Sequence, residues 1–411
     1  MENYDAIVVG AGPAGSAAAL FIADANNSVL LLDKSSFPRE KVCGDAFSGK
    51  SIGVMRELGL IEEIQKFQHG KVCGISMTAP NGKSITVAFP KADGMDIAGY
   101  TIRRQDLDSI FFNAAKQHKN IRAITGFTLQ GLLKNESGAV IGAEGAGADG
   151  IRQSFKSRVV VGADGAASAV SRLLGFPTLP LEHVYSAVRG YYRGIEGLTE
   201  NIELFFIDGV LPGYLWIFPM GDGLANVGLG ILSSDLQKGR KHPAVVLADA
   251  VANHPALCGR FKGSTLEGKI GGWSIPNGSF RKKLYGEGWV LVGDAASLVD
   301  PFSGEGVGNA LSSGKFAANA INLALSQSGD GPISASSLSS YSLRVDRELR
   351  PEMENSYKIQ RLSRFRFLLN LFIGKAATKP KARQMINDMF ASEEGKKKVE
   401  SPLTYLEMLL P

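Results

Sequence analysis

The stretch Asp5-Ala-Ile-Val-Val-Gly-Ala-Gly-Pro-Ala-Gly-Ser16 decides how the rest of the chain is interpreted. Residues 6–9 form a short apolar run, which is typical of a buried strand in a parallel sheet. Gly10, Gly12 and Gly15 follow at G-x-G-x-x-G spacing, and residues 16–23 are Ala-rich and predict a helix. A strand, a glycine-rich turn and a helix N-terminus in this order bind the pyrophosphate of a dinucleotide, because the turn leaves room for the phosphates and the helix offers unpaired N–H groups.

An acidic residue at the end of a second predicted strand supports this interpretation. Residues 28–32 predict this strand, apolar from residue 29 onward, and Asp33 follows them. A carboxylate about twenty residues after the turn can bind a ribose hydroxyl. The alternative is an ordinary glycine-rich turn in an α/β domain, but strand, turn, helix and acid in this spacing favour a dinucleotide.

Composition favours a globular enzyme of about two or three domains. The chain has 411 residues, of which 44% are hydrophobic and 21% are charged. Three cysteines, Cys43, Cys73 and Cys258, cannot form a disulfide framework, so we expect a reducing, cytoplasmic location. We identify no signal peptide and no apolar run long enough to span a bilayer.

The net charge of +5 is concentrated near the C-terminus, where residues 341–411 carry 14 Lys or Arg against 9 Asp or Glu. An apolar cluster lies within this region, flanked by Arg364, Arg366 and Lys375. Its members are Phe365, Phe367, Leu368, Leu369, Leu371, Phe372 and Ile373. A basic helix with a bulky apolar face can lie in a membrane interface, and the same pattern also fits a helix packed on the nucleotide-binding part. We keep both interpretations and expect no nucleic-acid partner.

Two later segments repeat the pattern of a buried strand followed by a glycine-rich turn. In residues 159–168 the strand runs into a turn that contains Asp164 and Gly165, and in residues 288–296 the strand stops at Asp294. Residues 301–309 form a further glycine-rich turn that opens a helix predicted to end near residue 325. One extended ligand that touches all these turns would explain why they recur so far apart in the sequence. Residues 145–150 also show G-x-G-x-x-G spacing, but their context predicts a hairpin tip.

Two further features have both a functional and a structural interpretation. Cys43 lies in a loop between Lys41 and Gly44, where it serves either chemistry or simple packing. Tyr214, Trp216 and Phe218 alternate in a predicted strand, so all three point to one face. That face is either the lining of an apolar pocket or ordinary sheet core.

Together these motifs resemble the flavoproteins typified by para-hydroxybenzoate hydroxylase and by the FAD domains of glutathione reductase. Within that class, Cys43-Gly44-Asp45 and Tyr214-x-Trp216-x-Phe218-Pro219 resemble the geranylgeranyl reductase family, as does Arg104 four residues before Asp108. The resemblance covers about residues 1–325. Glu305 departs from it, because relatives usually have a small residue there, and this changes the charge expected near the flavin.

The resemblance implies noncovalent FAD and no metal site. The glycine-rich turn would hold the pyrophosphate, Asp33 the adenosine ribose, Asp294 the ribityl chain and phosphate, and Arg104 would lie on the adenine or pyrophosphate side. Cys43 and Gly44 would lie near the flavin, with Gly306 and Val307 facing its ring system from a helix N-terminus. The full set of implied FAD-binding residues is Gly10, Gly12, Pro13, Ala14, Gly15, Asp33, Lys34, Cys43, Gly44, Ala46, Arg104, Asp164, Asp294, Gly304, Gly306 and Val307.

The expected architecture is an α/β fold in which two domains are interleaved. A Rossmann-like FAD-binding domain takes residues 1–75, 100–180 and 270–328. A mostly antiparallel β-sheet domain for substrate takes residues 76–99 and 181–269. Residues 340–411 are expected to form a helical C-terminal region.

The function implied by the resemblance is reduction of carbon–carbon double bonds in a polyprenyl lipid or quinone side chain, by hydride from N5 of reduced flavin. Tyr214, Trp216 and Phe218 would line the substrate pocket, and Cys43, Tyr214 and Trp216 are the candidate catalytic residues. The proton donor stays open between Cys43, Tyr214 and a bound water, and the reductant between NAD(P)H and a small electron carrier. The alternatives are an aromatic monooxygenase of the same fold and a non-enzymatic prenyl-binding carrier.

Overall fold

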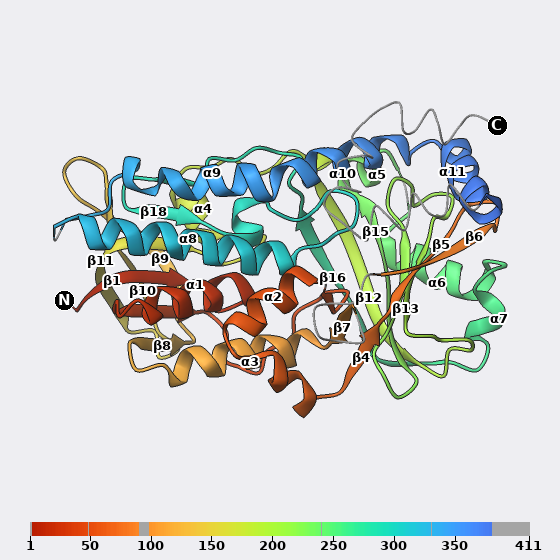
Figure 1. Ribbon diagram of the computed structural model, residues 1–411, viewed down its shortest axis with the longest axis horizontal. Helices are drawn as coiled ribbons and strands as arrows, with labels where there is room; N and C mark the ends of the chain where they lie inside the picture. The colour runs from red at the N-terminus through yellow and green to blue at the C-terminus, as the bar shows by residue number, and fades with distance from the viewer. Residues whose placement is uncertain (1, 48, 90–97, 240, 330, 380–411) are drawn as a thin grey trace.

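The structure, a computed structural model, describes residues 2–47, 49–89, 98–239, 241–329 and 331–379. The molecule is elongated, with one large sheet toward the end that holds the N-terminus and a second large sheet toward the other end (Figure 1). The predicted fold class is confirmed, because a largely parallel α/β unit is joined to a mostly antiparallel sheet and followed by helices.

The first sheet is built on parallel strands, as the apolar runs predict. β1 (Asn3–Val9) lies between β2 (Val29–Asp33) and β11 (Arg152–Gly162), and all three run parallel. Two further parallel strands continue the order outward, namely β8 (Ile121–Thr125) and β18 (Trp289–Leu291). Antiparallel additions complete the sheet, namely β9 (Thr128–Lys134), β10 (Val140–Ala146) and β17 (Tyr285–Gly286).

Two long helices pack against each other beside this sheet and carry glycine-rich turns at their N-termini. They are α1 (Pro13–Asp24) and α8 (Val307–Gln327). The remaining helices of this part are α2 (Gly49–Glu57), α3 (Arg104–Gln117), α4 (Ala169–Leu173) and the short 3-10 helices η1 (Ile61–Lys66) and η3 (Gly293–Ala296). Strand β1 is buried along Ala6, Ile7 and Val8, which fits a strand covered on both faces.

The second sheet has seven strands in the order β16-β12-β15-β14-β13-β5-β6, and only the β13–β5 pair is parallel. Their bounds are β5 (Gly74–Thr78), β6 (Ser84–Ala88), β12 (Val184–Arg193), β13 (Asn201–Phe205), β14 (Leu215–Pro219), β15 (Leu224–Leu232) and β16 (Thr265–Pro276). One apolar face packs on residues of α6 (Pro243–Asn253) and α7 (Cys258–Phe261). We call the other apolar face the inner face; it contains Trp216 and Leu204 and packs on α11 (Arg366–Thr378).

A small sheet and the C-terminal helices link the two large sheets. The small sheet is formed by β3 (Ala46–Phe47), β7 (Gly99–Ile102) and β4 (His69–Val72). Helix α9 (Ser339–Glu348) lies along the first sheet, and α10 (Arg350–Leu362) leads across to α11 beside the second (Figure 1). The short elements η2 (Leu181–His183), η4 (Ser336–Leu338) and α5 (Ser233–Gln237) complete the described part.

Several expected boundaries differ from the observed strands. The division expected at residue 270 falls inside β16, which pairs with β12 through Pro276, so residues 265–276 belong with the second sheet. Strand β5 likewise begins at Gly74, just before the division expected after residue 75. Helix α11 packs on β6 rather than on the FAD-binding part, because its buried residues meet the inner face. Residues 90–97 of the expected substrate domain and 380–411 of the expected C-terminal region lie outside the described residues.

Candidate active site

The first glycine-rich turn is shaped to admit a phosphate group. Gly10 has φ +102°, a backbone conformation that side chains rarely adopt, and Ala163 lies directly against it. At Gly12 the space is different, because the only described atom within 4 Å of a Cβ built there is Nη2 of Arg39, at 3.3 Å. Helix α1, with Pro13 at its first position, has no acidic residue in its first turn and no side-chain cap. Its N–H groups are therefore available to an anion.

The turns that lie far apart in the sequence meet at this point. Asp164 of the second turn lies against Gly10, as Ala163 does. A Cβ built at Gly293, in the third turn, would lie 3.0 Å from Cβ of Ala14. The structure thus brings the turns near residues 10, 164 and 293 together, as one extended ligand would require.

The carboxylates of Asp33 and Asp164 accept hydrogen bonds from different parts of the structure. Asp33 is buried, and its Oδ2 accepts a hydrogen bond from the Ala11 N–H at 2.7 Å, so its carboxylate braces the first turn. The Asp164 carboxylate accepts hydrogen bonds from the Ser168 hydroxyl and the Val170 N–H, which turns it toward α4. Burial raises the pKa of Asp164. Neither contact was predictable from the spacing of the turns.

Two arginines share one buried carboxylate beside the first turn. Asp108 is fully buried and pairs with Arg104 at 2.9 Å and with Arg39 at 3.1 Å. Burial alone would lower the pKa of Arg104, but Asp108 and Cys43 beside the guanidinium raise it overall. The structure therefore places Arg104 next to Cys43, whereas Arg39 is the cation at Gly12. Sequence reasoning missed Arg39, although a cation in the loop after the acidic strand was a usable signal.

Lys41 adds a third cation to this loop. It is largely buried, and burial lowers its pKa to about 8, while Asp294 opposes that shift and Arg104 adds to it. Its ammonium lies 3.7 Å from the ring centroid of Trp273 on β16. The loop is thus fastened to the edge of the second sheet by a cation–π contact. Lys34, by contrast, is exposed.

The Cys43-Gly44-Asp45 loop lies against the row of aromatic side chains predicted from the sequence. A Cβ built at Gly44 would lie 3.1 Å from the ring of Phe218 and 3.8 Å from Nε1 of Trp216. The Tyr214 and Trp216 ring centroids are 6.3 Å apart, and those of Trp216 and Phe218 are 6.1 Å apart. The three rings therefore form one row, which we call the aromatic wall, and a side chain at Gly44 would crowd it.

Asn226 joins the loop to the aromatic wall, and sequence reasoning missed it. Its Oδ1 accepts from the Trp216 indole N–H at 2.9 Å, and its Nδ2 donates to the Cys43 carbonyl oxygen at 2.8 Å. Asn226 lies opposite Phe218 in the β14–β15 register, so its side chain shares the face of the wall. A single buried amide thus fixes the indole relative to the loop.

The far end of the wall touches the turn that opens α8. The Tyr214 hydroxyl donates to the Ser303 carbonyl oxygen, and a Cβ built at Gly304 would lie 3.3 Å from that hydroxyl. Burial raises the pKa of Tyr214, which keeps the phenol protonated. Gly306 and Val307 begin α8, but Oε1 of Glu305 accepts from the Gly308 N–H at 2.7 Å. The departure at Glu305 therefore places a carboxylate at the N-terminus of α8, the helix end expected to face the flavin ring system.

A sequence family described as an FAD binding domain matches residues 3–342 of the chain. The chain belongs to this family. A menaquinone reductase from Mycobacterium tuberculosis is 33% identical over 328 residues, which cover 78% of this chain and 77% of the relative. A digeranylgeranylglycerophospholipid reductase from Methanococcoides burtonii is 33% identical over 329 residues, which cover 79% and 76%.

The fold is also that of a solved relative. A geranylgeranyl bacteriochlorophyll reductase-like protein from Thermoplasma acidophilum superposes with a TM-score of 0.84 at 23% identity and covers 100% of both chains. The resemblance to the geranylgeranyl reductase family is confirmed by these similarities. The chain is an FAD-dependent oxidoreductase of this type.

The residues of this FAD-binding protein fit the cofactor's charge. A pyrophosphate carries negative charge, and the first turn offers an uncapped helix N-terminus and the Arg39 guanidinium. The Nε of Arg39 is buried, and among the described residues it has no hydrogen-bond partner. A buried donor without a partner beside an anion-binding turn is what a bound phosphate would satisfy.

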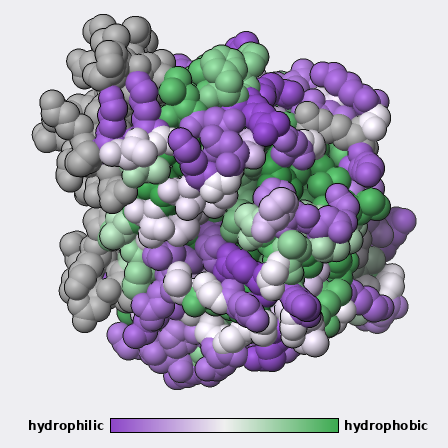
Figure 2. Space-filling model, turned by 90° about the vertical axis from the view of Figure 1, so that its right-hand side faces the viewer, coloured by the Kyte–Doolittle hydropathy of each residue, from purple (hydrophilic) through white to green (hydrophobic). Residues whose placement is uncertain are grey.

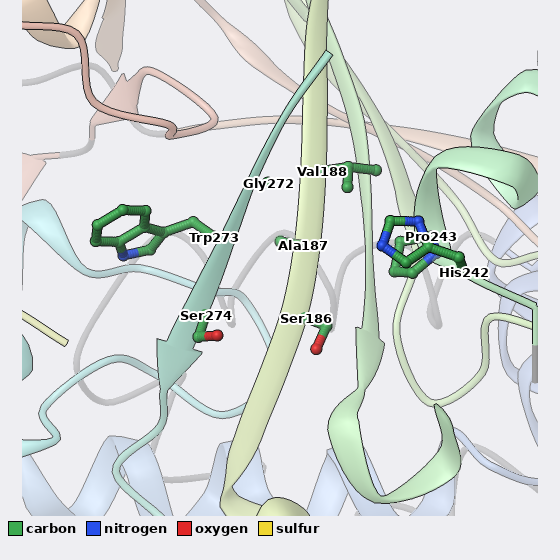
Figure 3. Close-up of a pocket in the computed structure, with 8 residues that line it drawn as sticks. All are labelled: Ser186, Ala187, Val188, His242, Pro243, Gly272, Trp273 and Ser274. Atoms are coloured by element: carbon green, nitrogen blue, oxygen red, sulfur yellow. The ribbon is translucent and has the colours of Figure 1, made fainter. Parts of the chain in front are cut away.

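A separate pocket of about 330 Å³ does not belong to this site. It lies along β12 and β16 at the start of α6 and is lined by Ser186, Ala187, Val188, His242, Pro243, Gly272, Trp273 and Ser274. The Trp273 ring lies on one side of the two strands, and His242 and Pro243 lie on the other (Figure 3). The His242 ring accepts from the Ala244 N–H and so caps α6. None of the described residues that line this pocket is an Asp, Glu, Lys or Arg, so this lining lacks the charged groups of the flavin site.

Proposed function

We propose that this FAD-dependent oxidoreductase saturates carbon–carbon double bonds in a polyprenyl lipid or in the side chain of a prenylated quinone. The observation that carries the proposal is the aromatic wall, which meets the Gly44 loop at one end and continues into the apolar inner face of the second sheet. Members of that face beyond the wall include Phe206, Leu204, Met77, Val87 and Ile75. These residues are buried against one another and against α11, so the rings of the aromatic wall, rather than the whole face, are the surface offered to substrate. A row of aromatic rings suits a long apolar chain better than a small polar substrate.

The chemistry needs both a hydride and a proton, because an isolated double bond is not activated. Reduced FAD, when bound, supplies the hydride from N5. The chain's own residues bind and orient the substrate: the aromatic wall packs along it, and the Cys43–Asn226 contact fixes the loop beside the wall. Gly304, Gly306 and Val307 would face the flavin at the other end, and Ala46 would lie near it from β3. The names of the two curated relatives, one a menaquinone reductase and one an archaeal lipid reductase, support a prenyl substrate.

The test is anaerobic incubation of the dithionite-reduced protein with geranylgeranyl diphosphate and, separately, with a menaquinone. Mass spectrometry should show products heavier by two hydrogens for each bond reduced, with matching reoxidation of the flavin. An enzyme that leaves both prenyl chains intact without oxygen, yet hydroxylates an aromatic compound when oxygen is admitted, would be the monooxygenase alternative instead.

We propose NAD(P)H or a small electron carrier as the physiological reductant. The rate at which each of them bleaches the absorbance of the oxidised flavin distinguishes the two.

We further propose that α11 brings the enzyme to the membrane that holds its substrate. Helix α11 buries Leu369, Ile373 and Ala376 against the inner face, while Phe365, Phe367 and Leu371 are exposed. Figure 2 views this end of the molecule and shows a hydrophobic patch near its upper edge, bordered by hydrophilic residues. None of the described helices is long and apolar enough to cross a membrane. The exposed residues would therefore anchor the protein at the surface only.

A further inference from the structure

Asp45 is a buried carboxyl group. Among the described residues, hydrogen-bond donors reach one of its oxygens but not the other. The residue is 2% exposed and has φ +67°, a region that few non-glycine residues occupy unless the surrounding structure holds them there. Its Oδ2 accepts from the Tyr191 hydroxyl at 2.6 Å and from Asn226 Nδ2 at 2.8 Å. Its Oδ1 is buried, and within the part of the chain that the structure describes it has no hydrogen-bond partner.

This carboxyl group lies beside the aromatic wall. Asn226 links it directly to the Trp216 indole, because the same amide accepts from Trp216 and donates to Asp45. The preceding residue, Gly44, is the one that touches Phe218. Asp45 is therefore part of the same loop that approaches the substrate surface, and its free oxygen is one that a proton could occupy.

We propose that Asp45 is the proton donor of this site, an assignment that rests on the proposed function. The π bond of the substrate breaks, the hydride forms one new C–H bond, and the Asp45 O–H breaks to form the other. FAD is left oxidised by two electrons and Asp45 is left as a carboxylate, which regains its proton from solvent. The Tyr191 and Asn226 donors already in place on Oδ2 stabilise that carboxylate.

The surroundings of Asp45 bring its pKa into a range suited to proton donation. Burial raises the pKa of Asp45 to about 6, while Tyr191, Arg189 and Asn226 from the second sheet and Arg104 from α3 each oppose the rise. A general acid works best when its pKa lies near the working pH. Cys43 and Lys41 are further titratable groups of this loop, and Cys43 lies beside Arg104.

The other candidate phenol is poorly placed for the role. The Tyr214 proton is engaged with the Ser303 carbonyl oxygen, and burial raises the pKa of Tyr214 further from neutrality. Tyr214 therefore contributes to the wall rather than to proton transfer. Of the remaining candidates, Cys43, Asp45 and a bound water, we favour Asp45 because its Oδ1 is buried beside the aromatic wall and has no hydrogen-bond partner among the described residues.

The first test is an infrared titration of the FAD-loaded protein. The spectrum of the wild type minus that of Asp45→Asn should contain a protonated-carboxyl band that disappears with a midpoint near pH 6. Tyr191→Phe should move this midpoint upward, because it removes a donor that favours the carboxylate. A difference spectrum with no such band in mildly acidic buffer would overturn the proposal without reference to activity.

The second test is a single turnover of the dithionite-reduced enzyme with geranylgeranyl diphosphate, without oxygen. Asp45→Asn should keep its flavin and be reoxidised normally by ferricyanide, yet reduce the prenyl chain about 100-fold more slowly or worse. Glu203→Gln is the matched control, because Glu203 is a buried carboxylate bound by Arg260 on the other face of the same sheet. An Asp45→Asn enzyme as fast as the wild type would overturn the role of Asp45 alone, whereas a wild type that reduces no prenyl chain would overturn the proposed function and this role with it.

Discussion

Gly12 is the position where the first turn leaves space that the protein itself does not fill. We predict that Gly12→Val abolishes copurification of FAD while the protein still folds, because its φ of −75° accepts a side chain and only Arg39 lies within 4 Å. The measurement is the ratio of flavin to protein absorbance, with circular dichroism to report folding. Gly15→Val is the contrasting variant: a Cβ there would run into the Gly10 carbonyl, so it should lose the fold as well. A Gly12→Val protein with its full complement of FAD would show that the pyrophosphate lies elsewhere.

The backbone of Cys43 is held by Asn226, which donates to its carbonyl oxygen, and its thiol lies beside the Arg104 guanidinium. We therefore predict that Cys43→Ala keeps FAD and thermal stability while slowing reduction of the prenyl substrate. Stopped-flow measurement of flavin reoxidation by substrate checks this, with ferricyanide reoxidation as the control. Unchanged kinetics would show that Cys43 only fills space in the fold and takes no part in turnover.

Asp45 makes stability depend on pH in a defined direction. Its pKa is raised from 3.8 to about 6 in the folded protein, so the folded state binds more protons than the unfolded state between these values. The free energy of unfolding of the wild type should therefore fall relative to Asp45→Asn by about 3 kcal/mol as the pH rises through this window. Denaturant unfolding of both proteins at several pH values measures the difference. A difference that stays constant across the window would mean that Asp45 does not titrate in it.

These single residues show what sequence can and cannot predict about the site. Gly10, Gly12 and Gly15 were predictable because a local spacing carries their role. Arg39, Asn226 and the burial of Asp45 were not, because each depends on partners brought together from distant segments: Asn226 and Asp45 are 181 residues apart. The site residues named from family resemblance alone stay predictions until the experiments above are done.

At the scale of elements, β14 carries two different functions on its two faces. Trp216 is the middle ring of the aromatic wall, whereas the next residue, Ile217, is fully buried among the residues that pack on α6 and α7. We predict that Trp216→Ala weakens long prenyl substrates more than short ones, because it removes apolar area worth roughly 25 cal/mol per Å². The comparison of kcat/KM for geranyl and geranylgeranyl substrates measures this selectivity.

Ile217→Ala provides the control within the same strand. It should cost about 2–5 kcal/mol of stability, as large-to-small changes in a core do, without altering preference for chain length. Equal losses for short and long substrates in Trp216→Ala would mean that the aromatic wall belongs to the protein core and does not bind substrate.

The alternation of side chains along β14 could be predicted from the sequence, because successive residues of a strand point to opposite faces. The bounds of β16 could not be predicted, because they depend on its pairing with β12, a strand far away in the sequence.

At the scale of the whole molecule, the C-terminal helices carry the chain from the first sheet to the far end of the second (Figure 1). This arrangement places α11 beside the apolar inner face and leaves part of that helix exposed. Two of the three flanking cations are already engaged, because Arg364 pairs with Asp235 at 3.2 Å and Arg366 with Asp208 at 2.9 Å. Electrostatic attraction to lipid, about 1 kcal/mol for each cation near an anionic surface, is therefore reduced, and insertion of aromatic side chains becomes the main contribution.

We accordingly predict that the protein cosediments with anionic vesicles and that substituting both Phe365 and Phe367 by Ser removes most of this binding. Their side chains are 54% and 65% exposed, so the substitutions should leave the fold intact, whereas Phe372 is partly buried in the inner face and is left unchanged. High salt should weaken the binding only in part, because Arg364 and Arg366 have acidic partners. Leu343→Ser is the matched control, an apolar residue 69% exposed on α9, and it should not alter binding. A wild type that does not bind vesicles, or a double variant that binds as well as the wild type, would rule out docking through α11, and the enzyme would then have to receive its prenyl substrate from a carrier.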